Sequence, residues 1–133
     1  MIRIFFIFLL ITFSQLVFAN STFEDMLSEA QKGNADAQYD VGKKYGKGEV
    51  VPQDYQQALY WVTKAAEQGH LKAQNKLGVI YEKGQGVPQD NQKAINWYKK
   101  SAEQGFINAQ YNIGLCQRGD CTSGLQTSFL LVH

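Results

Sequence analysis

The stretch GEVVPQDYQQALYWVTKAAEQG, from Gly48 to Gly69, is written a second time in altered form as GQGVPQDNQKAINWYKKSAEQG, from Gly84 to Gly105. Both copies place Pro-Gln-Asp, Trp and Ala-Glu-Gln-Gly at the same offsets, about 36 residues apart along the chain. A period of this length is typical of helical solenoids, in which one short unit is stacked repeatedly. The stretch therefore predicts a duplicated structural unit.

Each unit is predicted to contain two helices. Apolar and small residues such as Ala37 and Val41 recur at helical rather than alternating spacing. The proline of Pro-Gln-Asp stops a helix that arrives from upstream, and Asp54 can cap the next one, with Gln57 placed to complete a capping box. Gly69 follows where a left-handed residue ends a helix. The predicted fold class is all-α, a right-handed α/α superhelical solenoid of helix-turn-helix repeats.

The pattern AQxxLGxxYxxGxGVPQDxxKAxxWYxKSAEQG, read from Ala73 to Gly105, resembles the Sel-one-like repeat family. This family of α/α solenoids is related to the tetratricopeptide repeats, and the resemblance extends over residues 33–115. It implies a scaffold that binds other proteins without a cofactor, often in bacterial envelope or secretion settings. The predicted segments are a signal peptide at 1–19, a cap helix at 20–33, repeats at 34–69 and 70–105, the first helix of a third repeat at 106–115, and an irregular tail at 116–133.

The first segment, MIRIFFIFLLITFSQLVFAN, carries one cation at Arg3, an apolar run from Ile4 to Phe13 and a small residue at Ala19. This pattern predicts a signal peptide that is cleaved after Ala19. A short membrane anchor is the alternative, but the uninterrupted apolar run falls below the roughly 20 residues that a spanning helix needs. The mature chain is predicted to begin near Asn20 and to be exported, either periplasmic or secreted, without a membrane partner.

The third unit begins correctly at 105–115 with GFINAQYNIGL and then lacks the Tyr, the Pro-Gln-Asp and the Trp. Back-translation of 120–133 with suitable codons, shifted by one nucleotide, can read IVPQDYKQAFYWY, which is the missing second helix. One hypothesis is a small out-of-frame deletion near codons 115–119 that left 116–133 as a frame-shifted tail. The alternative is ordinary divergence of a C-terminal cap. The nucleotide sequence distinguishes the two.

Composition and motifs exclude several function classes. A formal net charge of +1, without a cluster of basic residues, argues against nucleic-acid binding. The sequence contains neither Ser-x-x-Lys nor Gly-x-Ser-x-Gly, so no catalytic residue is assigned and a non-enzymatic role is predicted. No metal site is assigned either, because His70 lacks partner ligands and is interpreted as a solvated turn residue. Cys116 and Cys121 can form a disulfide if the chain turns at Gly119, or they can stay free.

The two repeats and the start of the third differ on one face of their first helices, at offsets i, i+3, i+4 and i+7. In tetratricopeptide-like solenoids the first helices line the concave surface, so this face is a candidate binding groove. Tyr39 and Tyr111 would be anchors, and Lys72 with Lys76 would attract an acidic segment. The alternative is that the variation only marks a solvated face. The predicted partner-binding residues are Asp36, Tyr39, Asp40, Lys43, Lys72, Asn75, Lys76, Val79, Asn108, Tyr111 and Asn112.

The preferred function is a non-enzymatic scaffold that binds a protein or peptide on the concave face of the repeats. Two alternatives stay open. One is a cell-wall-related, penicillin-binding or β-lactamase-like activity, suggested by the cysteine-rich relatives that the family resemblance brings in. The other is a non-functional truncated gene product that is too short to form a groove.

Overall fold

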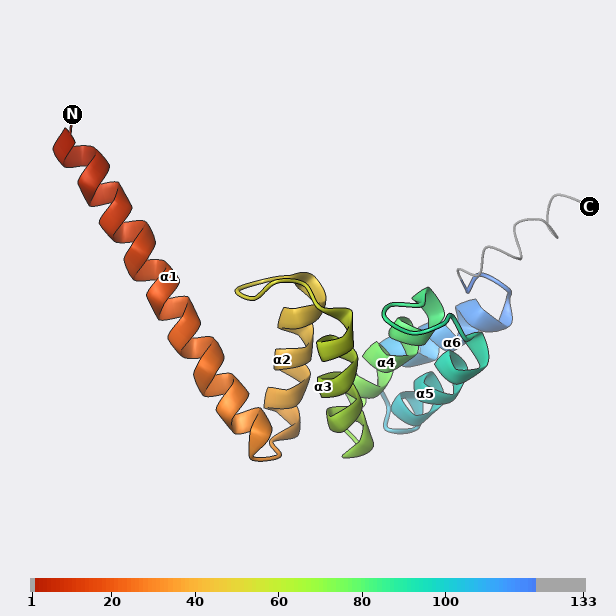
Figure 1. The fold of residues 1–133 in the computed structure, drawn as a ribbon. Coiled ribbons are helices and arrows are strands. Elements are labelled where there is room, and N and C mark those ends of the chain that lie inside the picture. The colour runs from red at the N-terminus through yellow and green to blue at the C-terminus, as the bar shows by residue number, and fades with distance from the viewer. Residues whose placement is uncertain (1, 122–133) are drawn as a thin grey trace, which may run out of the picture.

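The computed structural model describes residues 2–121, of which 12–14 and 16–21 are described by their backbone alone. This part of the chain contains six helices and no strand. They are α1 (Ile2–Gln31), α2 (Ala35–Lys47), α3 (Tyr55–Glu67), α4 (Leu71–Lys83), α5 (Asn91–Glu103) and α6 (Ile107–Gln117) (Figure 1). The prediction of an all-α solenoid is confirmed. Most of the predicted irregular tail lies outside the described residues.

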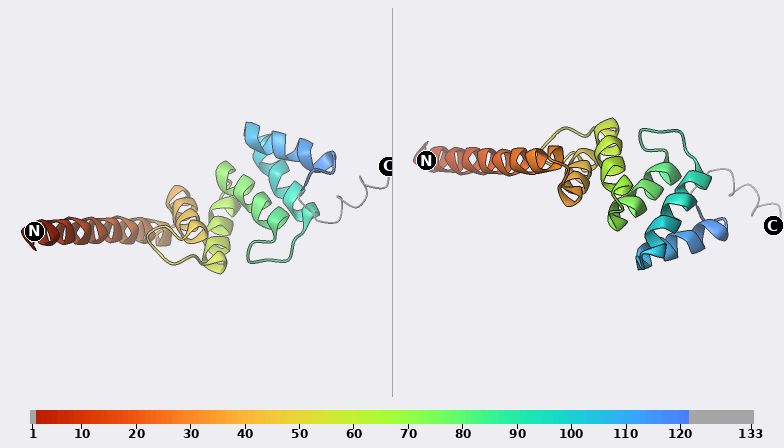
Figure 2. Two further views of the ribbon diagram at one scale, coloured as in Figure 1. Left: turned by 90° about the horizontal axis from the view of Figure 1, so that it is seen from above. Right: turned by 90° about the horizontal axis from the view of Figure 1, so that it is seen from below.

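Consecutive helices pack on each other, so the chain forms a stack of helix pairs. α2 pairs with α3 and α4 pairs with α5, while α1 packs on α2 and α6 packs on α5. Figure 2 shows this succession from above and below, with the long α1 projecting away from the stack. α1 runs without a break through the segments predicted as signal peptide and cap helix, and its Phe23 and Ala30 are buried in a cluster with Val41 and Trp61.

Among the described helices, none combines the length and the apolar content that crossing a membrane requires.

The Pro-Gln-Asp segment caps the second helix of a pair and holds it to the first helix through two further contacts. The Asp54 carboxylate accepts hydrogen bonds from the backbone N–H groups of Gln56 and Gln57, which caps α3. The Gln53 side chain donates to the carbonyl of Gly46 at 2.9 Å, and the Asp54 N–H donates to the carbonyl of Tyr45. Because that N–H is already bonded, the predicted capping box with the Gln57 side chain is wrong. The second pair repeats the arrangement through Gln89 and Asp90.

Glutamine side chains connect each pair to the next. Gln74 is only 5% exposed, and its amide donates to the carbonyl of Ala66 while its oxygen accepts from Gln104 at 2.7 Å. Gln38 does the same one unit earlier, donating to Ala30 and accepting from Gln68. A buried polar side chain needs such partners, since an unsatisfied one costs about 1–3 kcal/mol. The recurring Gln residues therefore fix how successive units sit on each other.

Glycine allows the helices within a pair to approach closely. A Cβ at Gly42 would lie 2.6 Å from Cγ2 of Val62, and a Cβ at Gly78 would lie 2.5 Å from Cδ1 of Tyr98. Gly114 occupies the same repeat position in α6, but nothing in the described chain lies within 4 Å of a Cβ built there. Within residues 2–121, α6 is thus a first helix without the second helix that packs on α2 and α4.

Candidate functional site

A cavity of about 130 Å³ opens between the two helix pairs. Its wall takes residues from both first helices, α2 and α4, from the beginning of α3, and from the loop after α4. Three of the residues predicted for partner binding, Tyr39, Lys43 and Lys76, line it. The complete lining is Tyr39, Lys43, Gly46, Lys47, Tyr55, Ala58, Lys76, Ile80 and Gln85.

The charge of this cavity comes from lysines that are unequally neutralised. Lys43 lies 3.6 Å from Asp40, and Lys47 lies 3.5 Å from Glu49, a carboxylate that also accepts a hydrogen bond from Lys44. Lys76 forms no ion pair with any described residue.

Lys76 is half-buried in the cavity wall. Burial lowers the pKa of Lys76 below its usual value, and repulsion from Lys83, Lys47 and Lys43 lowers this pKa further. The ammonium is therefore held in a place that disfavours its own charge. An anionic group at this position would relieve both effects.

Tyr39 stands at the other side of the cavity, where neighbours fix its ring. The ring stacks on that of His70 with centroids 4.9 Å apart, and Lys43 Nζ lies 5.2 Å from the Tyr39 centroid. Burial, and to a lesser degree the charge of Asp40, raises the pKa of the Tyr39 phenol. Its hydroxyl therefore stays protonated at neutral pH and can donate a hydrogen bond.

His70 is a capping residue, and its interpretation as a solvated turn residue is wrong. Only 13% of its side chain is exposed. Nδ1 accepts a hydrogen bond from the N–H of Ala73, which caps α4, and Nε2 lies 2.9 Å from Oδ1 of Asp36. Because Nδ1 accepts, the neutral ring carries its proton on Nε2 and donates it to Asp36. The imidazole thus links the starts of α2 and α4.

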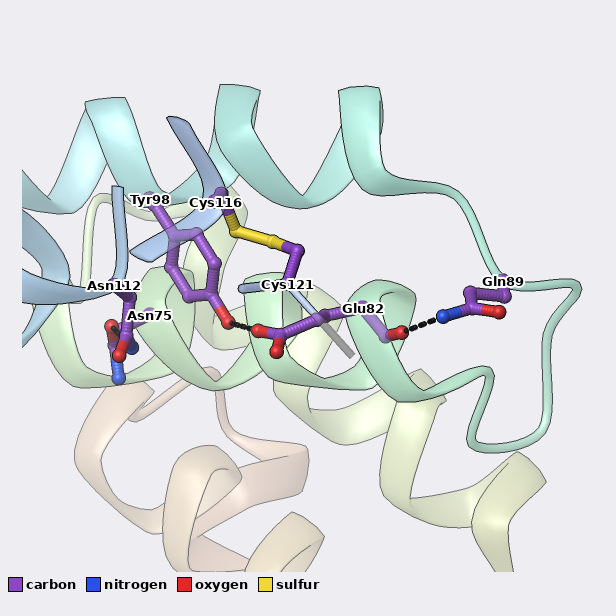
Figure 3. The surroundings of a disulfide bond; sticks show 7 residues. All are labelled: Asn75, Glu82, Gln89, Tyr98, Asn112, Cys116 and Cys121. Carbon is purple, nitrogen blue, oxygen red and sulfur yellow. Dashed lines mark hydrogen bonds between the residues drawn. A yellow bond between two sulfur atoms is a disulfide. The ribbon is translucent and has the colours of Figure 1, made fainter. Parts of the chain in front are cut away.

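The remaining predicted residues fall into different surroundings. The amide of Asn112 on α6 donates to Oδ1 of Asn75 on α4 at 3.0 Å (Figure 3). Val79 is partly buried, whereas Lys72, Asn108 and Tyr111 are exposed. Those four are not among the residues that line the cavity. The structure therefore brings only part of the predicted stripe together: three residues at the cavity between α2 and α4, and the Asn75–Asn112 pair between α4 and α6.

Sequence reasoning missed Lys47, Tyr55 and Gln85 in the cavity wall. Lys47 follows Lys43 by one helical turn, so extending the i, i+4 stripe would have found it. Tyr55 begins α3, and Gln85 lies in the loop after α4. Nothing in a pattern confined to the first helices indicates these two residues.

Cys116 and Cys121 are joined in a disulfide at the end of α6, with their Cα atoms 4.3 Å apart (Figure 3). The buried Tyr98 donates its hydroxyl hydrogen bond to the carboxylate of Glu82 beside them. Burial, followed by this bond, raises the pKa of Tyr98. Ligand atoms of Glu82 and both cysteines lie within 4.8 Å of one another, but the two sulfurs are bonded to each other and cannot act as thiolate ligands.

The repeat geometry can now be compared with known proteins. The Sel1 repeat family model matches the chain twice in succession, at residues 35–70 and 71–106. The chain belongs to the Sel1 repeat family. The resemblance inferred from the Pro-Gln-Asp and Ala-Glu-Gln-Gly motifs is thereby confirmed. Sel1 repeats typically mediate protein–protein interactions, and the family generally serves as a non-enzymatic scaffold.

Solved structures of Sel1 repeat proteins resemble this chain over most of its length. The SLR-fold protective antigen c5321 of uropathogenic Escherichia coli strains aligns with a TM-score of 0.71 and 40% identity, covering 74% of this chain and 21% of that one. A Sel1 repeat protein from Oxalobacter formigenes aligns with a TM-score of 0.68 and 32% identity, covering 71% and 39%. The chain thus corresponds to a minor part of each of these relatives.

Cysteine rich protein B of Helicobacter pylori aligns with a TM-score of 0.65 and 20% identity, covering 68% of both chains. At this identity the match shows a shared fold alone. Among curated proteins no match is found.

Proposed function

We propose that the chain is a non-enzymatic Sel1 repeat adaptor that binds a protein or peptide segment on the side of the stack formed by α2, α4 and α6. The observation that carries this proposal is the cavity between α2 and α4, whose wall contains Tyr39, Lys43 and Lys76. Clefts between packed elements, lined by aromatic and charged side chains, are the usual places where partners bind.

The repeats themselves separate structural positions from candidate binding positions. Gln38 and Gln74 have the same role in holding the stack, and so have Gly42 and Gly78. On the proposed binding face, by contrast, Tyr39 of the first repeat corresponds to Asn75 of the second. The residues that stabilise the stack are the same in both repeats, whereas the residues on this face differ and are free to specify a partner.

A hydrolytic activity of the β-lactamase type has less support. Ser101 is fully buried, and its hydroxyl donates to the carbonyl of Leu71 at 2.7 Å. It is therefore placed to secure the α4–α5 pair and not to attack a substrate, since a nucleophile must be accessible and lie beside a base. A nitrocefin hydrolysis assay tests this alternative, and turnover above the buffer control would support it.

The experiment for the adaptor function selects peptides from a random display library on the immobilised full chain. Selected peptides should lose affinity for a Tyr39→Ala variant and retain it for a Lys99→Ala variant, which changes an exposed residue of α5. If the Tyr39 substitution leaves the binding of every selected peptide unchanged, the assignment of the binding face is wrong. A circular dichroism melt of each variant checks that both are folded.

Export and the third repeat are part of the same proposal. The pattern of Arg3, the apolar run and Ala19 supports cleavage of residues 1–19, and the mass of the protein recovered outside the cytoplasm tests it. The lack of the Tyr, Pro-Gln-Asp and Trp motifs after Leu115 supports the loss of a second helix by a frameshift near codons 115–119. The DNA sequence tests this, because Pro-Gln-Asp-Tyr must be encoded in the shifted frame.

A further inference from the structure

We propose that the cavity between α2 and α4 is a carboxylate-binding subsite, in which Lys43, Lys47 and Lys76 hold the side chain of a glutamate or aspartate in an acidic peptide. This inference rests on the proposed adaptor function and names the chemistry of the partner. It is carried by the charge balance, the size and the walls of the cavity.

The lysines around the cavity outnumber the carboxylates that could neutralise them. Asp40 forms an ion pair with Lys43, and Glu49 forms ion pairs with both Lys44 and Lys47. Both carboxylates are about half exposed, and neither lines the cavity. Lys76 has no carboxylate partner within the described chain, and it faces the charges of Lys43 and Lys47. The cavity therefore presents an excess of positive charge to whatever enters it.

The size of the cavity suits one acidic side chain. Its volume is about 130 Å³, and a cavity of roughly 150 Å³ is known to accommodate a benzene-sized molecule. Gly46, Ala58 and Ile80 supply an apolar wall against which methylene groups can pack. The hydroxyl of Tyr39 and the amide of Gln85 add uncharged donors beside the lysines. A carboxylate on a short methylene stem matches both the polar and the apolar part of this lining.

A peptide fits better than a free anion or a nucleic acid because of what lies next along the stack. Asn75 and Asn112 bridge α4 and α6 with one hydrogen bond, and each amide group has further donor or acceptor capacity. Such amides can bond the backbone of an extended peptide that crosses from the cavity toward α6. The formal net charge of +1 provides no broad basic surface of the kind that nucleic acids require.

The experiment uses two fluorescein-labelled octapeptides that differ only in two central residues, glutamate in one and glutamine in the other. Fluorescence anisotropy with the full chain should give about tenfold tighter binding of the glutamate peptide, the effect of one charge-assisted hydrogen bond. Lys76→Met should remove this preference, so that the glutamate peptide binds the variant no more tightly than the glutamine peptide does. Lys99→Met, which removes the same charge from the exposed face of α5, should change neither affinity.

The possible outcomes separate this inference from the adaptor function. If both peptides bind equally to the wild-type chain, or if Lys99→Met weakens the glutamate peptide as much as Lys76→Met does, the carboxylate subsite is wrong. Weakening of both peptides by Tyr39→Ala would then still support the adaptor function. Displacement of the glutamate peptide by inorganic phosphate as readily as by an unlabelled copy would show a general anion site and overturn the assignment to a peptide.

Discussion

The close approach of α4 and α5 at Gly78 allows a sharp test of the packing described above. A Gly78→Ala variant places a methyl group 2.5 Å from Cδ1 of Tyr98, and closer still to Cε1. Carbon atoms prefer about 3.5–4.0 Å, so the helices must separate by roughly 1 Å. The Tyr98 ring cannot turn aside, because it is fully buried and its hydroxyl is bonded to Glu82.

The Gly114→Ala variant is the matched control for this substitution. Both glycines lie inside helices at the same repeat position, and replacing either with alanine gains about 0.5–1 kcal/mol of helix propensity. The added methyl group at position 114 meets nothing in the described chain, whereas the one at position 78 brings an overpacking cost of about 1–3 kcal/mol. The difference in free energy of unfolding between the two variants therefore isolates the overpacking cost.

Thermal or urea unfolding, followed by circular dichroism, measures both variants against the wild-type chain. Gly78→Ala should lower the melting temperature and Gly114→Ala should hold or raise it, with about 4–8 °C expected for each kcal/mol in a chain of this size. Equal stability of the two variants would refute the reasoning, because it would mean that α4 and α5 are not in the contact described.

Three further predictions concern the stack, the caps and the cavity. Gln74→Ala should lower the free energy of unfolding by about 1–3 kcal/mol, since it removes two hydrogen bonds of about 0.5–1.5 kcal/mol each, one to the Ala66 carbonyl and one from the Gln104 amide. Gln110→Ala, at an exposed site, should change it far less in the same urea titration. Asp54→Ala should cost about 1 kcal/mol through loss of the α3 cap, and Asp54→Asn should recover most of it in thermal melts. Lys76→Met should raise stability at pH 7, because it removes a charge that burial and neighbouring lysines disfavour. The pKa of Lys76 is lower in the folded chain than its unfolded value of 10.5. As the pH rises from the folded pKa to 10.5, the free energy of unfolding of the wild-type chain should therefore increase, and the stability advantage of Lys76→Met should shrink. An advantage that grows with pH would contradict this sign.

The sequence was sufficient to predict the repeat architecture because the signals are local. Gly48 ends α2 in the left-handed conformation, Asp54 caps α3 a few residues later, and the glycine after Ala-Glu-Gln adopts a positive φ, 88° at Gly69. These features act within one unit and recur in the next. A single sequence therefore contains two observations of each feature.

The contacts between units were harder to predict. Gln74 donates to the carbonyl of Ala66 in the preceding unit, and His70 reaches Asp36, a residue 34 positions earlier. Both depend on how one pair sits on the next, which helical periodicity does not contain. For the same reason, the lining of the candidate site could be predicted only in part. The stripe on the first helices contained Tyr39, Lys43 and Lys76, but the cavity also required Tyr55 and Gln85, which only the stacking brings to its wall.

The linked glutamines have a consequence for how such proteins change length over evolution. Gln74 donates its side-chain amide to the carbonyl of Ala66 in the preceding unit, and Gln38 donates in the same way to Ala30, while each of these glutamines accepts a bond from a second glutamine of its own unit. The glutamine bond at each junction is made by positions that both units share, so inserting or deleting one whole unit preserves this bond. Array length can therefore vary by duplication or loss of about 36 residues at a time while this bond between units is kept.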